Sequence, residues 1–238
     1  MRSAVATSII KACALTALIG AILVARPPGA SGDDLQLWTV VTVDQKIVDR
    51  LEGGIQTRVR LIDDVSLARD VLVRPFLGWQ VSDRFDLDLG YDYLHSLKSE
   101  FLSEHRIWQM AEYRMPIERF DLRGMVRLDQ RFVEDVSGVV VRLRFRARAT
   151  FELSPSLYLA TSDEVFLNLN DRGVGPPQGL EQNRVRAGLG WTWKRTRIEA
   201  AYEWHVNAGR GRSNQDLHVF ALEFSLDRGA IRAARRNR

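Results

Sequence analysis

The segment from Val139 to Phe151 constrains the fold of this chain more than any other. Apolar side chains alternate in it with four arginines, which are Arg142, Arg144, Arg146 and Arg148. Successive residues of a β-strand point to opposite faces, so this segment has one apolar face and one face with four guanidinium groups. The same alternation recurs about ten times along the sequence. Such a recurrence is typical of a transmembrane barrel with an apolar outer surface and a polar interior.

The alternation divides the chain into eleven candidate strands, most of them about 10–13 residues long. A tilted transmembrane strand needs about 9–11 residues, whereas strands of soluble proteins usually have about 5–6. We therefore predict an all-β fold, an antiparallel up-and-down transmembrane β-barrel of 10–12 strands. The candidate strands are 35–43, 50–61, 69–80, 84–94, 104–114, 120–132, 139–151, 157–167, 182–193, 197–206 and 215–226.

The number of strands conflicts with a general rule. An odd number places the two ends of a barrel on opposite sides, whereas single-chain bacterial barrels have even counts. The sequence therefore predicts either ten strands, with 35–43 outside the barrel, or twelve, with one strand not recognised.

The two ends of the chain differ from the middle. Residues 1–32 resemble a secretory signal peptide, because Arg2 and Lys11 precede an apolar stretch and small residues precede a cleavage point near Gly32. The alternative, a retained membrane anchor, has an apolar run shorter than the roughly 20 residues of a spanning helix. The barrel is expected over 33–226, followed by a basic periplasmic tail over 227–238.

Composition excludes several kinds of function. The one cysteine, Cys13, lies in the predicted leader, so the mature chain would have no thiol for disulfides, metal binding or catalysis. The excess of basic residues lies in the leader and the tail, which removes the support for nucleic-acid binding. An acidic stripe at 86–92 suits counter-charges to nearby arginines better than calcium, which needs six to eight oxygen ligands or so. We expect no metal and no cofactor.

The polar face of the ladder is predicted to line the interior as a network of arginines with acidic residues. Pairing 104–114 with 120–132 so that opposed residue numbers sum to 235 gives four ion pairs and places Trp108 beside Arg127. The four pairs are Arg114 with Asp121, Glu112 with Arg123, Arg106 with Asp129, and Glu104 with Arg131. Similar arithmetic places Asp129 by Arg142, Arg144 by Glu164 and Arg186 by Glu203. The candidate lumen-lining residues, for a pore or an internal network, are Glu104, Arg106, Glu112, Arg123, Arg127, Asp129, Arg131, Arg142, Arg144, Arg146, Arg148, Glu164, Arg184, Arg186 and Glu203.

The connections predict the orientation. Short turns at 82–83, 116–119, 154–156 and 194–196 share one end, and mostly longer loops share the other. The short-turn end should face the periplasm and the longer loops the outside. The longest loop, 168–181, is the best candidate for a segment that folds over the mouth.

Several segments resemble a known bacterial group, domain-of-unknown-function family 2490, whose members are predicted to form outer-membrane barrels. The matching stretches are 36–39, 104–109, 127–132, 142–146, 164–166, 182–184 and 202–203. The resemblance implies the fold and the location, and it brings no catalytic residues.

We therefore predict a non-enzymatic protein of the cell outer membrane, structural or a narrow channel for small solutes. Fixed charges in a wide barrel would select ions, but side chains fill the lumen of a small barrel, so a narrow or plugged lumen is favoured. Its expected partners are outer-membrane lipids and, through the aromatic strand 218–226, the barrel-assembly machinery during insertion.

Two alternatives belong to other classes. A lipid-processing enzyme of the outer membrane would need a serine or an acid within reach of His95 or His205 on a surface at the membrane edge. His205 is predicted to point inward beside Arg184, whereas His105 and His218 should point outward. A soluble periplasmic β-barrel that binds an apolar ligand would instead carry its arginines on the outside.

Overall fold

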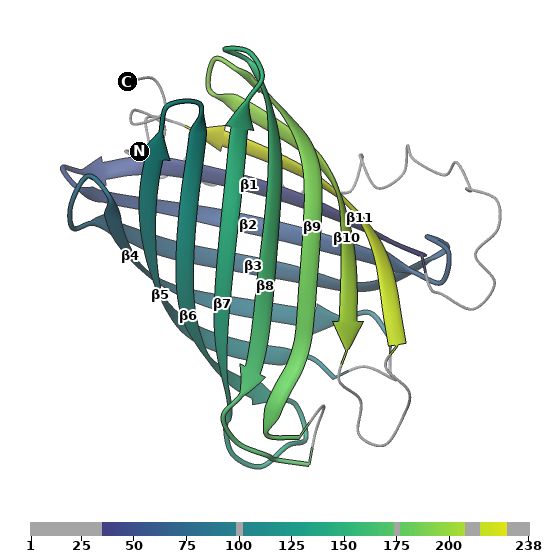
Figure 1. Cartoon of the computed structure of the whole chain (residues 1–238). Helices are drawn as coiled ribbons and strands as arrows, with labels where there is room; N and C mark the ends of the chain where they lie inside the picture. Colours follow the sequence, from purple (N-terminus) through teal and green to yellow (C-terminus); the bar gives the residue numbers. More distant parts are fainter. Residues whose placement is uncertain (1–34, 99–101, 174–176, 208–214, 228–238) are drawn as a thin grey trace, which may run out of the picture.

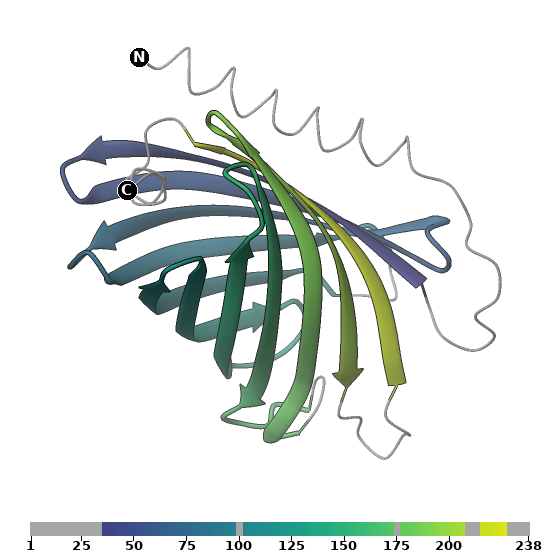
Figure 2. The ribbon, with the colours of Figure 1, turned by 45° about the horizontal axis from the view of Figure 1, so that its top comes forward.

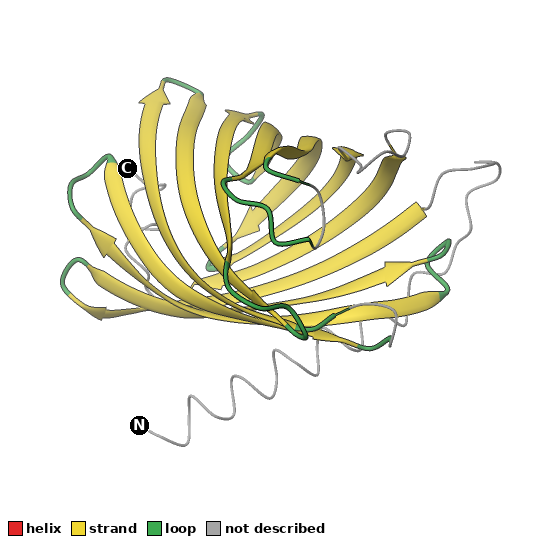
Figure 3. Cartoon of the chain, turned by 90° about the horizontal axis from the view of Figure 1, so that it is seen from below, coloured by secondary structure: helices red, strands yellow, loops and turns green. Residues whose placement is uncertain are grey.

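The computed structural model describes residues 35–98, 102–173, 177–207 and 215–227, and these residues form strands and loops (Figure 3). None of them belongs to a helix long and apolar enough to span a membrane. The predicted leader and all but the first residue of the predicted tail lie outside the described residues. The strands are β1 (Leu35–Val48), β2 (Leu51–Ile62), β3 (Leu67–Gln80), β4 (Phe85–Ser96), β5 (Glu104–Ile117), β6 (Phe120–Val133), β7 (Val140–Glu152), β8 (Leu157–Asn168), β9 (Gly179–Trp193), β10 (Thr196–Asn207) and β11 (Gln215–Asp227).

The strands of the described residues form one closed barrel of eleven, in which neighbours along the chain are antiparallel (Figure 1). Because strand direction alternates along the chain, the first and the last of eleven strands run the same way. β1 and β11 accordingly close the barrel as a parallel pair, from Leu35 opposite His218 to Asp44 opposite Asp227. The all-β barrel is confirmed, while both even counts were wrong, because a parallel seam closes an odd number without leaving a free edge.

The two ends of the barrel differ as predicted. Short connections lie at one end, called here the turn end, and include the two-residue turns at 118–119 and 194–195. The other end, called the loop end, holds the connections 97–103, 134–139, 169–178 and 208–214, with a shorter one at 63–66. β1 starts at the loop end and β11 finishes at the turn end. Figure 2 shows the steep inclination of the strands of the front wall against those of the back wall.

The outer surface of the barrel is apolar. Large apolar side chains stand exposed on each strand from β3 to β11, and four tryptophans are among them: Trp79, Trp191, Trp193 and Trp204. Their strand neighbours at alternate positions point inward and are mostly polar or charged, as the period of two requires. The polar core of this molecule is thus its lumen, and the apolar face is its exterior.

Candidate functional site

The structure places all fifteen predicted lumen residues on the inner face of the barrel. Arg142 of β7 and Asp129 of β6, for example, are direct partners that are buried and face the lumen. Phe145 and Val126, a partner pair three positions along the same two strands, are exposed on the outside. This placement follows from the alternation of the strands, since each predicted residue lies an even number of positions from a buried polar residue of its own strand. Whether these residues serve as a pore or as a network stays a prediction.

The register predicted between β5 and β6 was wrong by two residues. Glu104 lies opposite Val133 and Arg114 opposite Arg123, because a tight turn at Glu118-Arg119 replaces the longer turn we expected. Glu118 adopts a positive φ of 49° in that turn. Register in a hairpin is set by loop length, so a shorter turn moves every pair.

Three of the four ion pairs expected from that register nevertheless form, along diagonals instead of directly across. The distances are 2.8 Å for Arg114–Asp121, 3.2 Å for Arg123–Glu112 and 2.8 Å for Arg131–Glu104. Diagonal neighbours on one face of a sheet lie within reach of long side chains. The fourth arginine, Arg106, instead contacts Glu104 and lies 3.9 Å from Asp92.

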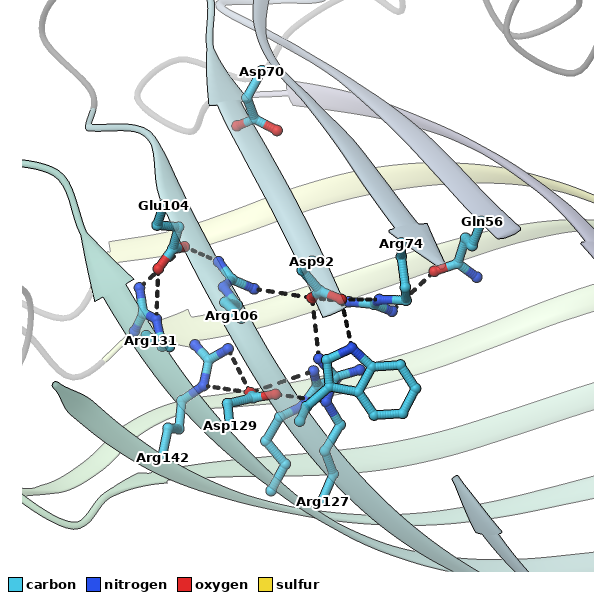
Figure 4. A network of polar contacts seen from close by, with 12 residues as sticks. Gln56, Asp70, Arg74, Asp92, Glu104, Arg106, Arg127, Asp129, Arg131 and Arg142 are labelled. Carbon is cyan, nitrogen blue, oxygen red and sulfur yellow. Dashed lines mark hydrogen bonds and ion pairs between the residues drawn. The ribbon is translucent and has the colours of Figure 1, made fainter. Parts of the chain in front are cut away.

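Asp92 of β4 is the first centre of the interior network (Figure 4). Its carboxylate is fully buried and accepts two hydrogen bonds of 2.7 Å from Arg74 of β3. It also accepts one of 2.6 Å from the indole N–H of Trp108 and one of 3.1 Å from Arg127. Gly90 lies opposite Trp108 on β4, and the indole ring occupies the space that a Cβ at Gly90 would need. The missing side chain therefore lets the ring lie flat over β4 and aim its N–H at Asp92.

Asp129 of β6 is the second centre and is also fully buried. It accepts hydrogen bonds from Arg127 at 2.6 Å and from Arg142 at 2.9 and 3.1 Å, and Arg144 lies 3.8 Å away. Arg127 is shared by the two centres and stacks 4.2 Å from the centre of the Trp108 ring. The predicted contacts of Asp129 with Arg142 and of Trp108 with Arg127 are confirmed.

Three glutamates extend the network around the barrel. Glu104 binds Arg106 and Arg131, Glu164 of β8 binds Arg144 at 2.6 Å, and Glu181 of β9 binds Arg142 at 3.2 Å. Together with Asp92 and Asp129 they connect side chains from β3 to β9 in one set of contacts, which we call the central network. We define it by Arg74, Asp92, Glu104, Arg106, Trp108, Arg127, Asp129, Arg131, Arg142, Arg144, Glu164 and Glu181.

A second group surrounds Arg186 of β9. Its guanidinium lies 2.6 Å from Glu203, 2.8 Å from Glu223 and 2.9 Å from Glu199. Glu199 also accepts hydrogen bonds from Arg148 at 2.6 Å and from the hydroxyl of Tyr158 at 2.9 Å. The predicted pair of Arg186 with Glu203 is therefore confirmed, and this second group links side chains from β7 to β11.

The histidines lie where strand parity predicted. His105 and His218 are on the outer face, where each is hydrogen-bonded to a tyrosine. His205 is buried opposite Arg184, with Nε2 2.7 Å from Glu203 and its ring edge-on to Trp38. An acid is thus within reach of His205, but the pair lies inside the barrel and not at the membrane edge.

Several interior residues escaped the sequence analysis. Trp38 is surrounded by the guanidinium groups of Arg58, Arg60 and Arg184 at 4.9–5.3 Å. Glu199 and Glu223 have the inward parity of Glu203 and Ser225 on their strands, so parity alone would have found them.

Glu181 was assigned to the longest loop. It points inward because a bulge between Phe166 and Leu167 shifts the register where β9 begins. The described start of the loop is fixed to the chain at the start of β7. Asn170 accepts a hydrogen bond of 2.9 Å from the backbone N–H of Val141 and donates one of 2.9 Å to the carbonyl of Val139.

A cavity of about 310 Å³ lies in the turn-end half of the lumen. Its lining runs from Arg127 and Arg144 of the central network to Lys194 and Arg195 of the turn between β9 and β10. No group of three or more histidine, aspartate or glutamate side chains able to hold a metal ion occurs in the described ranges.

Comparison with known protein families shows to which family the chain belongs. A family model described as "Protein of unknown function (DUF2490)" matches residues 35–216. The chain belongs to this family. The resemblance inferred from the sequence is thereby confirmed, and the match begins at the first residue of β1 and includes the strands that carry the central network.

Individual relatives are distant. The chain is 27% identical over 173 residues to the uncharacterized protein MexAM1_META1p0181 of Methylorubrum extorquens, covering 70% of this chain and 74% of that protein. Among solved structures, LpxR from Salmonella typhimurium matches with a TM-score of 0.46 and 7% identity, over 74% of this chain and 83% of that one.

A loop-deletion mutant of OmpT, an outer membrane protein of Vibrio cholerae, matches with a TM-score of 0.42 and 11% identity over 73% of this chain. This chain spans 62% of the length of that structure.

Proposed function

We propose that this DUF2490 protein is a non-enzymatic β-barrel of the bacterial outer membrane whose central network closes the lumen to all but slow passage of small solutes. The observation that carries the proposal is the complete burial of Asp92 and Asp129, each bound by two arginines. A wide aqueous channel would leave such carboxylates hydrated. Small barrels are generally filled by their own side chains.

The apolar exterior supports the membrane location. Exposed tryptophan, tyrosine, leucine and phenylalanine side chains cover the outer wall, and soluble monomers rarely expose contiguous apolar areas of more than a few hundred Å² or so. In the membrane, the turn end of such a barrel faces the periplasm and the loop end faces the outside of the cell. A soluble barrel with an apolar ligand inside would need the opposite arrangement, with the arginines in water.

The enzymatic alternative has less support. Its strongest element is the contact of His205 with Glu203, at 2.7 Å. His205 is only 1% exposed and lies against Trp38 inside the lumen, so a lipid acyl chain outside the wall has no access to it. The non-enzymatic function therefore fits the position of the pair better.

Planar-bilayer recording of purified, refolded protein tests the proposal. We expect the wild-type barrel to show little conductance, and the Arg127→Ser/Arg144→Ser variant to show stable steps with a preference for cations. The variant removes two bulky cations from the network while Asp92, Asp129 and Glu164 keep their charges.

The matched control is Arg119→Gln, which removes a guanidinium that binds the Leu153 carbonyl and the Phe151 ring outside the lumen. It should behave like the wild type. Large steps in the wild type that are unchanged in the double variant would contradict a lumen closed by this network.

A further inference from the structure

The cavity at the turn end contains more basic than acidic side chains. Eight lysines and arginines and five aspartates and glutamates line it. Four of the arginines already bind acidic residues: Arg74, Arg123, Arg127 and Arg144. The remaining cations are Arg146, Lys194, Arg195 and Arg197.

These remaining cations are poorly neutralised by the protein. Arg146 of β7 is a third exposed and lies 3.8 Å from Glu112. Glu164 lies opposite Arg146 on β8, but Arg144 binds Glu164 more closely, at 2.6 Å. Glu112 itself is bound more closely by Arg123, at 3.2 Å. Arg195 and Arg197 lie in the turn before β10 and at its start, and neither forms an ion pair within the described part of the chain.

The acidic side chains of the lining are already engaged. Glu223 binds Arg186 at 2.8 Å, and Asp44, Asp88 and Asp227 make contacts of their own. The lining of the cavity therefore includes arginines of β7 and of the β9–β10 turn region, on different parts of its wall. Planar guanidinium groups bind the oxygens of phosphate in pairs, which makes arginine the preferred residue for such groups.

We propose that the turn-end cavity is a binding site for a phosphate group, held by Arg146, Arg195 and Arg197. Its volume of about 310 Å³ is at the lower end of small-molecule sites, so it admits a phosphate-bearing solute or a single lipid headgroup. The central network forms the inner wall of the site, because Arg74, Arg127 and Arg144 belong to its lining.

Calorimetric titration of the full-length protein in a maltoside detergent, which contains no phosphate, tests the site. Inorganic phosphate and glycerol 3-phosphate serve as probes. We expect binding that weakens about a hundredfold or more in Arg146→Gln/Arg197→Gln, since each of the two lost charge-assisted hydrogen bonds contributes about a factor of ten. Arg119→Gln, on the outside of the same end, should bind like the wild type.

A second titration separates the two sources of phosphate. Binding that persists in nanodiscs of phosphatidylglycerol identifies a soluble ligand. Binding present in detergent and lost in these nanodiscs identifies a headgroup that occupies the site, and both results support the proposal. Absence of binding in detergent, or equal weakening by the control, would overturn it.

An independent measurement avoids substitutions that affect folding. Phenylglyoxal modifies accessible arginines, and mass spectrometry locates the products. Phosphate should protect Arg146 and Arg197 of the wild type, but not Arg119. Equal modification with and without phosphate would count against the site.

Discussion

Asp129→Asn is the substitution that tests the energetics of the central network most sharply. The side chain keeps its size but loses its charge, and it is buried beside three arginines, Arg127, Arg142 and Arg144. Breaking a buried ion pair by removing one partner costs about 3–5 kcal/mol, because the other charge stays buried without compensation.

The arginines around Asp129 keep other partners, and this sets the expected size of the effect. Arg127 retains Asp92 at 3.1 Å, Arg142 retains Glu181 at 3.2 Å and Arg144 retains Glu164 at 2.6 Å. We therefore expect a loss near the lower limit, about 3 kcal/mol in the free energy of unfolding.

Urea unfolding in lipid vesicles, followed by tryptophan fluorescence and by the heat-dependent gel mobility of folded barrels, measures this loss. Asp135→Asn is the control, because Asp135 is exposed in the loop after β6 with a positive φ of 60° that asparagine tolerates. It should change stability by less than about 0.5 kcal/mol.

A double-variant cycle adds a test of coupling. Arg142→Gln should cost less in the Asp129→Asn background than in the wild type, since their contact at 2.9 Å is then already lost. If Asp129→Asn were as mild as Asp135→Asn, or if the two changes were additive, the network would not be the stabilising unit that we describe.

Two further predictions concern the wall of the barrel. The parallel seam predicts that Thr39→Cys/Leu222→Cys forms a disulfide on oxidation, because these residues are direct partners of β1 and β11, while Thr39→Cys/Ala200→Cys does not; protein electrophoresis with and without reductant shows which pair links, and the reverse result would exclude this closure. Gly90→Ala should lower stability by about 1–3 kcal/mol because its Cβ meets the Trp108 ring, whereas Gly124→Ala meets nothing within 4 Å and should be nearly neutral in the same urea assay. Equal stability of the two glycine variants would show that Trp108 is not fixed over β4.

The sequence predicted the strands and their inner faces well because both depend on a local period of two. Because alternate residues point to opposite faces, placing Phe145 on the outside directs Arg142, Arg144 and Arg146 to the inside. Register arithmetic between neighbouring strands placed His205 beside Arg184 and Asp129 beside Arg142, and both pairings are found in the barrel.

Features that depend on turns and on the closure of the barrel were harder to predict from the sequence. The register of β5 against β6 depends on a two-residue turn at Glu118, and the inward direction of Glu181 depends on a bulge between Phe166 and Leu167. The parallel seam depends on contacts between the two ends of the chain, for which alternation contains no signal. Trp38 was missed because an aromatic residue at an inward position looks the same in sequence as one in the outer wall.

The closed lumen is tested most directly by the bilayer recording of the wild-type protein alone. Folding is first established by heat-dependent gel mobility, so that a silent trace reports a closed barrel and not an unfolded one. Our account predicts a folded barrel with little conductance. Stable, large conductance steps from the folded wild type would contradict it, because ions would then pass through the lumen that the central network is proposed to close.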